Sequence, residues 1–374
     1  QTADTIRINN ASNNNDRGTR YEVIRTGTGS IEVAAGRDVQ LRNPFATIYT
    51  AGVGHADHTA VFESGEFTPP LTTPSRHPDQ GGTLGAAQQN YQTYYAMAGG
   101  DLRLASGRDI GRFARLGDGT VVADSSGQLP TQWLYRRGLV DPASGLFARV
   151  ASSGFGAFTD HSASTTWWVD YSNFFQGFGA LGGGNILMKA SRDLVNADAA
   201  IPTSARMPGQ DAASGDSAAT RQNLAPDEAN LLEYGGGDLV VRAGRNLDGG
   251  NYYVERGEAS LRALDEITTN EARSLTPWRL TSSQSLLDPS TWQAVTLFGG
   301  RTQFDVAARR DVLLGPATAA FLLPQGLNNK FWYKTQFQTI DPSAGLSAAS
   351  FGGAVTHRLG VTLPGDTLAL PVLE

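Results

Sequence analysis

The chain of 374 residues contains no cysteine. This absence excludes disulfides, thiolate nucleophiles and cysteine-ligated metal, and it suits a protein that is exported unfolded through an oxidising periplasm. Lysine is also scarce, since only Lys189, Lys330 and Lys334 occur. No run approaches the roughly 18 apolar residues of a membrane span, and no signal-peptide pattern follows Gln1. We therefore expect a mature or excised piece of a protein.

A basic footprint is also missing. The formal net charge is −6, and lysine and arginine are scattered along the sequence instead of forming a stripe, so nucleic acid is not an expected partner. Glycine, in contrast, is abundant, because 44 of 374 residues is nearly twice the average usage of about 7%. With 40% hydrophobic residues, the composition predicts a folded core with many tight turns.

One pattern occurs five times in the chain. The copies are SIEVAAGRDVQL from Ser30, DLRLASGRDIGRF from Asp101, NILMKASRDLVN from Asn185, DLVVRAGRNLDG from Asp238 and QFDVAARRDVLL from Gln303. Each copy begins with alternating apolar residues, which is the signature of a half-buried strand. The first apolar residues, which should all point inward, are Ile31, Leu102, Ile186, Leu239 and Phe304. Each copy then passes a corner into a second short strand.

These units are too small to bury an apolar face alone, so they must stack on one another as the rungs of a solenoid. The sequence predicts an all-β fold, a parallel β-helix with long loops and lobes, as a single domain over 1–374. The main rungs are expected near 30–42, 101–113, 185–196, 238–249 and 303–314. The excursions are expected at 43–98, 112–182, 198–236, 268–299 and 316–374. Weaker rungs are expected near Ile6 and Val23, directly beneath the Ile31 rung, and near Leu261.

An acidic or amide residue recurs at the corner of every copy, at Asp38, Asp109, Asp193, Asn246 and Asp311. Such an array suggests calcium binding or glycoside hydrolysis as alternatives. However, Asn246 cannot act as a general acid, whereas all five side chains can accept hydrogen bonds in a turn. The tandem Gly-Gly-x-Gly-x-Asp of calcium-binding repeats is also absent. We therefore expect local turn hydrogen bonds at these positions, and no metal or cofactor.

Pairs of glycines precede four of the strands, at 99–100, 183–184, 236–237 and 299–300. They are expected to let the chain re-enter the stack after an excursion.

The copies GSIEVAAGRDV, GDLRLASGRDI and GDLVVRAGRNL resemble the filamentous-haemagglutinin-like large exoproteins of two-partner secretion. The stalks of that family repeat Gly-Asp/Asn-apolar-x-apolar-x-Ala-Gly-Arg-Asp-apolar. Residues 167–208 are also similar to a segment of long family members. The resemblance implies a right-handed parallel β-helix that is exported by an outer-membrane partner transporter and then secreted or displayed on the bacterial cell surface. The family's amino-terminal secretion domain is not visible here.

Aromatic residues cluster in the middle of the chain, at Trp133, Trp167, Trp168, Tyr171, Phe174 and Phe175. Such rings either bind sugars and protein partners or fix a lobe onto the flank of the stack. The two interpretations separate by burial, because a contact surface stays exposed. A second cluster, Phe331, Trp332, Tyr333 and Phe337, carries the same alternatives.

Two further groups suggest chemistry without supporting context. His55, Asp57 and His58 are close enough in sequence for a metal site, but no third ligand is evident. Asp160 and His161 lie near Ser162 and Ser164, but no Gly-x-Ser-x-Gly elbow accompanies them.

The expected function is therefore that of a structural, adhesive segment of an exoprotein, an adhesin of the kind used in cell adhesion or biofilms, and not an enzyme. Its loops would contact a host or neighbouring cell, a glycan or a matrix protein. The alternatives are a β-helix lyase or glycosidase, for which Asp160 and Asp170 are candidate acids, and a calcium-binding repeat protein.

Overall fold

The computed structural model describes residues 23–42, 46–54, 70–72, 88–90, 95–115, 118–124, 128–130, 133–138, 164–169, 171, 174–208, 232–269, 294–322, 341–357, 361–363 and 366–368. The fold is all-β, and most strands belong to one large, mostly parallel sheet. The described residues also include the short 3-10 helix η3 (Ala320–Leu322). No helix in the described part of the chain is long and apolar enough to cross a bilayer.

The parallel strands form three stacks. The first stack contains β2 (Ile31–Ala35), β9 (Leu102–Ser106), β15 (Ile186–Ala190), β20 (Leu239–Ala243), the second halves of β22 (Asn251–Ala263) and β24 (Val295–Ala308), and β26 (Gly345–Ser350). The second stack contains β3 (Val39–Leu41), β10 (Ile110–Arg115), β16 (Leu194–Val195), β21 (Leu247–Asp248), β23 (Ile267–Thr268), β25 (Val312–Thr318) and β27 (Val355–His357). The third stack contains β1 (Val23–Thr26), β4 (Thr47–Thr50), β14 (Phe178–Ala180), β17 (Ala199–Ile201), the first halves of β22 and β24, and the end of β25.

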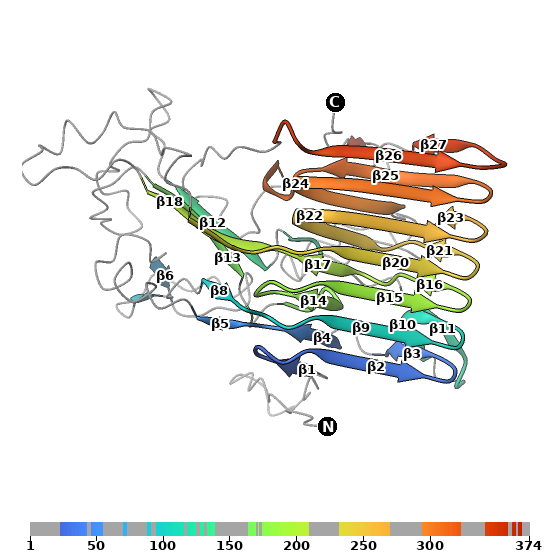
Figure 1. Ribbon diagram of the computed structural model, residues 1–374, viewed down its shortest axis with the longest axis horizontal. Coiled ribbons are helices and arrows are strands. Elements are labelled where there is room, and N and C mark those ends of the chain that lie inside the picture. Colours follow the sequence, from blue (N-terminus) through green and yellow to red (C-terminus); the bar gives the residue numbers. More distant parts are fainter. Residues whose placement is uncertain are drawn as a thin grey trace, which may run out of the picture.

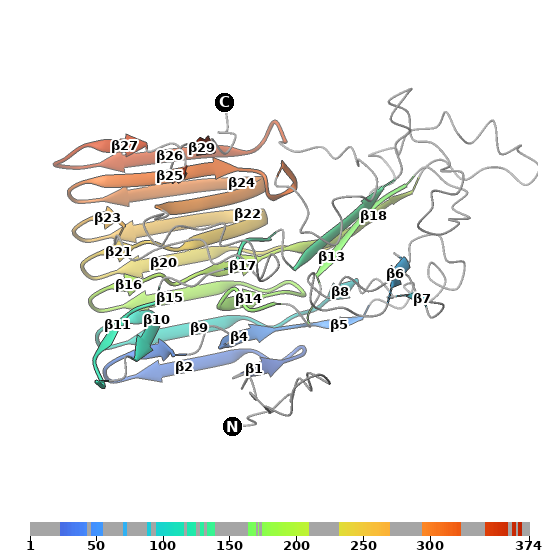
Figure 2. The same ribbon diagram turned by 180° about the vertical axis from the view of Figure 1, so that it is seen from behind.

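The chain visits the first, second and third stacks in that order and then returns to the first. We call one such passage a rung and number the rungs from β2, so that rung 7 consists of β26 and β27. Successive rungs pair in register and lie about 4.8 Å apart, the usual spacing of hydrogen-bonded strands. Figures 1 and 2 show the rungs following one another in chain order from β2 at one end to β26 at the other.

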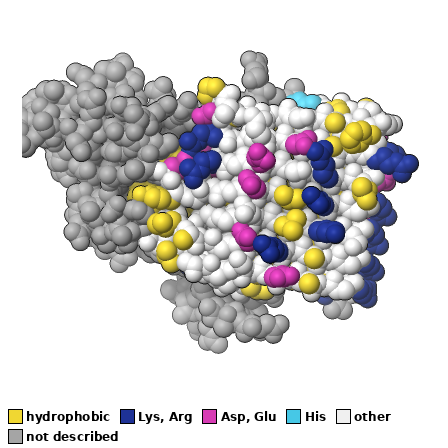
Figure 3. Space-filling model, viewed as in Figure 1, with side chains coloured by type: hydrophobic (Ala, Val, Ile, Leu, Met, Phe, Trp, Pro, Cys, Tyr) yellow, Lys and Arg dark blue, Asp and Glu magenta, His cyan; other side chains and the backbone are white. Residues whose placement is uncertain are grey.

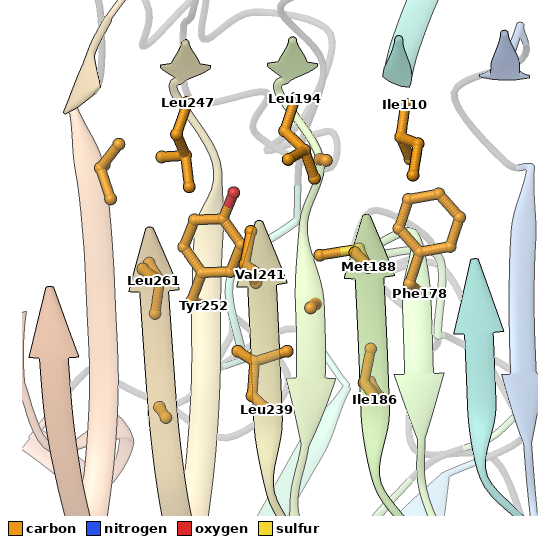
Figure 4. Packing of buried hydrophobic residues seen from close by; sticks show 14 of the residues in the cluster. Ile110, Phe178, Ile186, Met188, Leu194, Leu239, Val241, Leu247, Tyr252 and Leu261 are labelled. Carbon is orange, nitrogen blue, oxygen red and sulfur yellow. The ribbon is translucent and has the colours of Figure 1, made fainter. Parts of the chain in front are cut away.

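The apolar core lies between the three stacks. Strands β9 and β15 alternate between buried and exposed residues, and their buried residues face the interior. In Figure 4, Ile186 and Met188 of β15 point into the same space as Leu194 and Leu247 of the second stack. The predicted inward positions are confirmed, since all five are buried. They are Ile31, Leu102, Ile186, Leu239 and Phe304.

The third stack was not predicted from the sequence, because its strands lie inside the regions expected to be excursions. Residues 47–50, 178–180 and 199–201 are buried on both faces of the strand. A strand that is covered on both sides loses the alternation of polar and apolar residues. The predicted excursions 43–98, 112–182, 198–236, 268–299 and 316–374 therefore each contain a strand that contributes to the stacks.

The weaker rungs differ in their outcome. The prediction near Leu261 is confirmed, because the second half of β22 pairs with both β20 and β24. The prediction that Val23 lies directly beneath the Ile31 rung is confirmed in the third stack, because β1 pairs with β4, the last strand of rung 1, and not with β2. Ile6 lies outside the described residues.

A second, antiparallel sheet lies beside the stacks. It has the order β12 (Leu134–Gly138), β13 (Ser164–Val169), β18 (Thr203–Pro208) and β19 (Leu232–Gly235). Figures 1 and 2 show it to one side of the stacks, on the same side as the short pair β5 (Val53–Gly54) and β8 (Ala96–Met97). We call the antiparallel sheet of β12, β13, β18 and β19 the lateral sheet. The remaining short strands are β6 (Pro70–Thr72), β7 (Gln88–Asn90), β11 (Val121–Ala123), β28 (Val361–Leu363) and β29 (Asp366–Leu368).

Glycines line the corner at which the third stack returns to the first. Gly184 and Gly237 occupy equivalent places in successive rungs, with φ of +102° and +152°. A Cβ atom at Gly237 would lie 2.2 Å from the carbonyl oxygen of Gly184, so a side chain has no room there. The pair Gly299 and Gly300 is different, because both residues lie inside the continuous strand β24.

Candidate functional site

The junction between the lateral sheet and the third stack contains most of the aromatic residues singled out in the sequence. The third stack turns Tyr49, Tyr253 and Phe298 outward, and these rings pack against Trp133 and other residues of a second hydrophobic cluster. Trp133 meets Phe174 edge-on with ring centroids 5.1 Å apart, and it lies 5.9 Å from Tyr253. We call this cluster the aromatic junction.

The polar atoms of the tryptophans are satisfied inside the junction. Trp133 Nε1 donates to Gln176 Oε1 at 2.6 Å, and Trp167 Nε1 donates to Thr203 Oγ1 at 3.0 Å. Trp167 also meets Phe321 edge-on with centroids 5.1 Å apart. Because buried tryptophans need a partner for the indole N–H, these bonds fix the orientation of the rings.

Burial identifies these aromatic residues as packing elements rather than as an open contact surface. Five of the six are buried, namely Trp133, Trp167, Trp168, Phe174 and Phe175. Tyr171 is half-buried, and its hydroxyl donates to the carbonyl oxygen of Ala51. The Arg25 guanidinium lies 5.6 Å from the Tyr171 ring centroid. The rings therefore attach the lateral sheet to the third stack, and a partner protein cannot reach them in this arrangement.

One carboxyl group is buried where the third stack turns into the first. Glu255 is 6% exposed, and its Oε2 accepts a hydrogen bond from the Tyr253 hydroxyl at 2.8 Å. Burial raises the pKa of Glu255 to about 8, although the bond from Tyr253 acts in the opposite direction. Gly300 makes space for this group, because a Cβ atom there would lie 2.0 Å from Glu255 Oε1. The glycine pair at 299–300 thus accommodates a buried acid and is not a point of re-entry.

A second buried carboxylate connects the lateral sheet to the stacks. Glu233 of β19, with a side chain only 4% exposed, forms ion pairs with Arg256 and Arg301. Arg256 also donates to the carbonyl oxygen of Gly235 at 2.5 Å. Both side chains are nearly inaccessible and are bonded within the fold, Glu255 to Tyr253 and Glu233 to Arg256 and Arg301.

Charged side chains at the corner between the first and second stacks join successive rungs. Arg108 of rung 2 donates through Nε and Nη2 to both carboxylate oxygens of Asp38 in rung 1, at 3.0 and 2.7 Å. Asp38 Oδ1 also accepts the backbone N–H of Asp109 at 3.3 Å. Arg192 and Arg245 bond in the same way to the aspartates one rung below, Asp109 and Asp193. We call this series the corner ladder.

The expectation of local turn hydrogen bonds is therefore corrected. The acceptors at Asp38, Asp109, Asp193, Asn246 and Asp311 bond to the next rung, not to their own turn. The reason is geometric, because in-register stacking places the next backbone N–H about 4.8 Å above each side chain. A parallel series of polar side chains joins the starts of the first-stack strands, from Asp101 through Asn185 and Asp238 to the backbone of Glu258.

Asn246 stands where the rungs before it have an aspartate, and this difference explains why the following rung has Asp265 in place of an arginine. Asn246 has no charge to pair, and at the position where other rungs have arginine the next rung has Asp265. Asp265 in turn receives both Nε and Nη2 of Arg310 from the rung above, at 2.5 and 2.7 Å. Bidentate pairing between an arginine and an aspartate thus resumes between rungs 5 and 6. The acidic partner, Asp265, lies one residue earlier in its rung than the aspartates of the other rungs do.

The corner ladder lowers the pKa of two of its carboxyl groups, Asp38 and Asp193. The bond from Arg108 holds the pKa of Asp38 below its ordinary value. At Asp193, burial opposes ionisation, but the bonds from Arg245 and from the Asn246 backbone outweigh it and lower the pKa. These carboxylates therefore stabilise the fold above the unfolded pKa of about 4, and this contribution is lost as the pH falls through the lower folded pKa.

We expect Asp193→Ala to lower the free energy of unfolding by about 2 kcal/mol, because it removes a charged acceptor from Arg245 and from the Asn246 backbone. Asp193→Asn should cost about half as much, since an amide still accepts the backbone bond, as Asn246 does in the next rung. Urea unfolding at pH 7 measures both. The control is Asp305→Ala, which breaks the exposed pair with Arg262 and should cost less than about 1 kcal/mol. Equal losses at the two positions would contradict a special role of the corner ladder.

The other candidate sites lie mostly outside the described residues. This holds for the histidine-rich group His55, Asp57 and His58, for Asp160, His161, Ser162 and Asp170, and for the aromatic cluster Phe331, Trp332, Tyr333 and Phe337. In the part of the chain that the structure describes, no group of three or more histidine or acidic side chains is placed to hold a metal ion. The carboxylate oxygens of Asp38, Asp109 and Asp193 accept hydrogen bonds from arginines of the next rung.

Comparison with protein-family models, with curated proteins and with solved structures gives no match to this chain.

Proposed function

We propose that the chain is a right-handed parallel β-helix and that it serves as a structural, adhesive segment of a secreted or surface-displayed bacterial exoprotein. The observation that carries the proposal is that the stacks form a continuous support to which the lateral sheet is attached. The three stacks join rung to rung through the corner ladder, which makes an extended support. The aromatic junction fixes the lateral sheet to one side of this support.

Among the described residues, the buried carboxylates and the corner aspartates are engaged in the architecture of the fold. Glu255 and Glu233 are nearly inaccessible, and Asp38, Asp109 and Asp193 are bonded to arginines. This favours a supporting role over a lyase or glycosidase. The same pairing disfavours calcium at the corner, since a cation would have to displace a bidentate arginine.

The copies GSIEVAAGRDV, GDLRLASGRDI and GDLVVRAGRNL, each close to Gly-Asp-x-x-x-x-Ala-Gly-Arg-Asp, support the resemblance to filamentous-haemagglutinin-like exoproteins. On this proposal an outer-membrane partner transporter exports the chain, and the connections that leave the stacks contact another cell, a glycan or a matrix protein. Two of these connections join neighbouring strands of the lateral sheet, β12 to β13 and β18 to β19. A rigid support with variable connections on one side is a common arrangement for recognition.

We expect excision of residues 140–162 to reduce attachment of the purified, labelled chain to bacterial or host cells at least tenfold. The excision is feasible because Gly138 pairs with Thr165, so a short turn can join β12 to β13. Far-UV circular dichroism and the urea midpoint should stay unchanged, which separates loss of contact from loss of folding. The matched control replaces Phe351, an exposed residue of rung 7, by Ser and should bind normally.

Full attachment by the excised chain, and by a chain that also lacks 210–230, would contradict the proposal. The release of reducing ends from a panel of polysaccharides by the intact chain would favour the enzymatic alternative instead.

A further inference from the structure

The outward face of the first stack carries basic residues that are far apart in the sequence but adjacent in space. Lys189 of β15 pairs with Arg242 of β20, and Arg242 pairs with Arg262 of β22. Neighbouring strands lie about 4.8 Å apart, so these side chains leave the sheet one above the other. The fold thus assembles a basic column that the scattered arginines and lysines of the sequence do not predict.

The middle of this column has no acidic partner. At the β22 end of the column, Arg262 forms an ion pair with Asp305. On β9, one strand before the strand of Lys189, Arg103 forms an ion pair with Asp101. Lys189 and Arg242 are exposed, and among the described residues neither forms an ion pair or hydrogen bond. Like charges in directly paired positions destabilise a sheet. A bound anionic group between these two residues would remove that repulsion.

Two arginines of the corner ladder extend the basic surface sideways. Arg192 and Arg245 follow Lys189 and Arg242 by three residues, and their side chains remain 42% and 52% exposed. Each uses Nε and Nη2 to bond the aspartate one rung below. The Nη1 groups are not engaged in these bonds. Figure 3 shows basic side chains gathered on this face and along the adjoining edge, where the first-stack strands turn into the second stack.

Aliphatic side chains lie next to the basic residues on the same face. Leu187 and Val240 pair in register two residues before Lys189 and Arg242, and Leu187 is 38% exposed. The face therefore offers cations and an aliphatic surface side by side on the same two rungs. A polymer of sugar rings matches this combination, because its anionic groups meet cations while its C–H faces cover the aliphatic side chains.

We propose that Lys189, Arg192, Arg242 and Arg245 form a binding site for a linear acidic polysaccharide that lies along the stack axis. Carboxylate or sulfate groups of the polymer bind between the paired cations, and a sugar ring packs on Leu187 and Val240. The site is on the flat first stack and not on the lateral sheet, so it is independent of the function proposed above.

The surroundings favour a polysaccharide over nucleic acid. Carboxylates stand on the same face at both ends of the basic region, with Glu32 on rung 1 and Asp305 on rung 6. The chain as a whole carries a formal charge of −6. A nucleic-acid backbone requires a broad basic footprint, whereas a short stretch of an acidic polymer can bind between the two carboxylates.

The test measures binding of fluorescent polygalacturonate to the full chain, with neutral dextran and duplex DNA as comparison ligands. The double variant Lys189→Gln/Arg242→Gln should bind polygalacturonate at least tenfold more weakly at low salt. The control Arg42→Gln/Arg309→Gln removes the same charge from exposed positions outside the site and should bind within twofold of the original chain. Binding by the original chain should weaken with salt, with a logarithmic slope of about −3 to −4 if all four cations of the site are neutralised.

Retained affinity in the Lys189→Gln/Arg242→Gln variant, or an equal loss in the control, would overturn the proposal. Equal binding of neutral dextran, or tighter binding of duplex DNA than of polygalacturonate, would also overturn it. The melting temperature of the Lys189→Gln/Arg242→Gln variant should not fall, because these two exposed cations have no partner among the described residues.

Discussion

Glu255→Gln should stabilise the protein by about 4 kcal/mol at pH 8 and by less than about 1 kcal/mol near pH 4.5. The reason is that the folded protein holds Glu255 with a pKa raised to about 8, because its carboxyl is buried between Tyr253 and Gly300. In the unfolded chain the same group ionises near pH 4.5. The stability contributed by the protonated carboxyl is fully present below the unfolded pKa and is lost as the pH rises toward 8. Glutamine keeps the hydrogen-bond acceptor for Tyr253 without the charge.

Urea unfolding of both proteins at several pH values between 4.5 and 8.5 measures this difference. The original protein should lose stability steadily across that range relative to Glu255→Gln. A matched control is Glu258→Gln, which changes an exposed glutamate of the same strand β22 and should leave the pH profile unaltered. Parallel profiles for the original protein and Glu255→Gln would mean that the carboxylate is solvated in the folded state.

Trp133→Ala should lower the free energy of unfolding by about 3 to 5 kcal/mol, the usual range for a large aromatic side chain lost from a core. Trp133 has no solvent exposure, and it contacts both Phe174 and Tyr253. Its removal leaves a cavity in the aromatic junction and deprives Gln176 of a donor. Urea unfolding followed by far-UV circular dichroism measures the loss.

Two further substitutions define what the Trp133 result means. Trp133→Phe retains a ring but not the indole N–H, so its cost should be intermediate, about 1 to 3 kcal/mol. Phe351→Ala removes a ring that is 79% exposed and should change stability by less than about 0.5 kcal/mol. A loss below 1 kcal/mol for Trp133→Ala would show that the junction does not hold the lateral sheet.

The sequence predicts the first stack well and the third stack poorly, for one physical reason. Residues such as Leu102 and Leu104 alternate with exposed neighbours because solvent covers the outer face of β9, and this period of two is visible in the sequence. The third-stack strands TIYT, FGA and AAI are covered on both faces and show no alternation. Their place in the fold follows from tertiary contacts that a single sequence does not display.

The same contrast applies to the polar sites. The recurrence of Asp38, Asp109 and Asp193 could be seen in the sequence, and their structural rather than metal-binding use was inferred from Asn246. The direction of their bonds could not be inferred, because it depends on the register between rungs that are 71 or 84 residues apart. The pairing of Lys189 with Arg242 depends on that register too, which is why scattered cations became a column only in three dimensions.

The uneven length of the connections has a consequence for the order of folding. The first-stack bond from Glu258 to Asp238 closes a segment of only 20 residues, whereas the bond from Asn185 to Asp101 closes 84. Closing the longer segment costs about 1.3 kcal/mol more free energy, because the loss of chain entropy grows with the logarithm of the segment length. Strand β22 also continues from rung 4 into rung 5 without an excursion. We therefore expect rungs 4 and 5 to pair first during folding, and the earlier rungs to add to them against the direction in which the chain is synthesised.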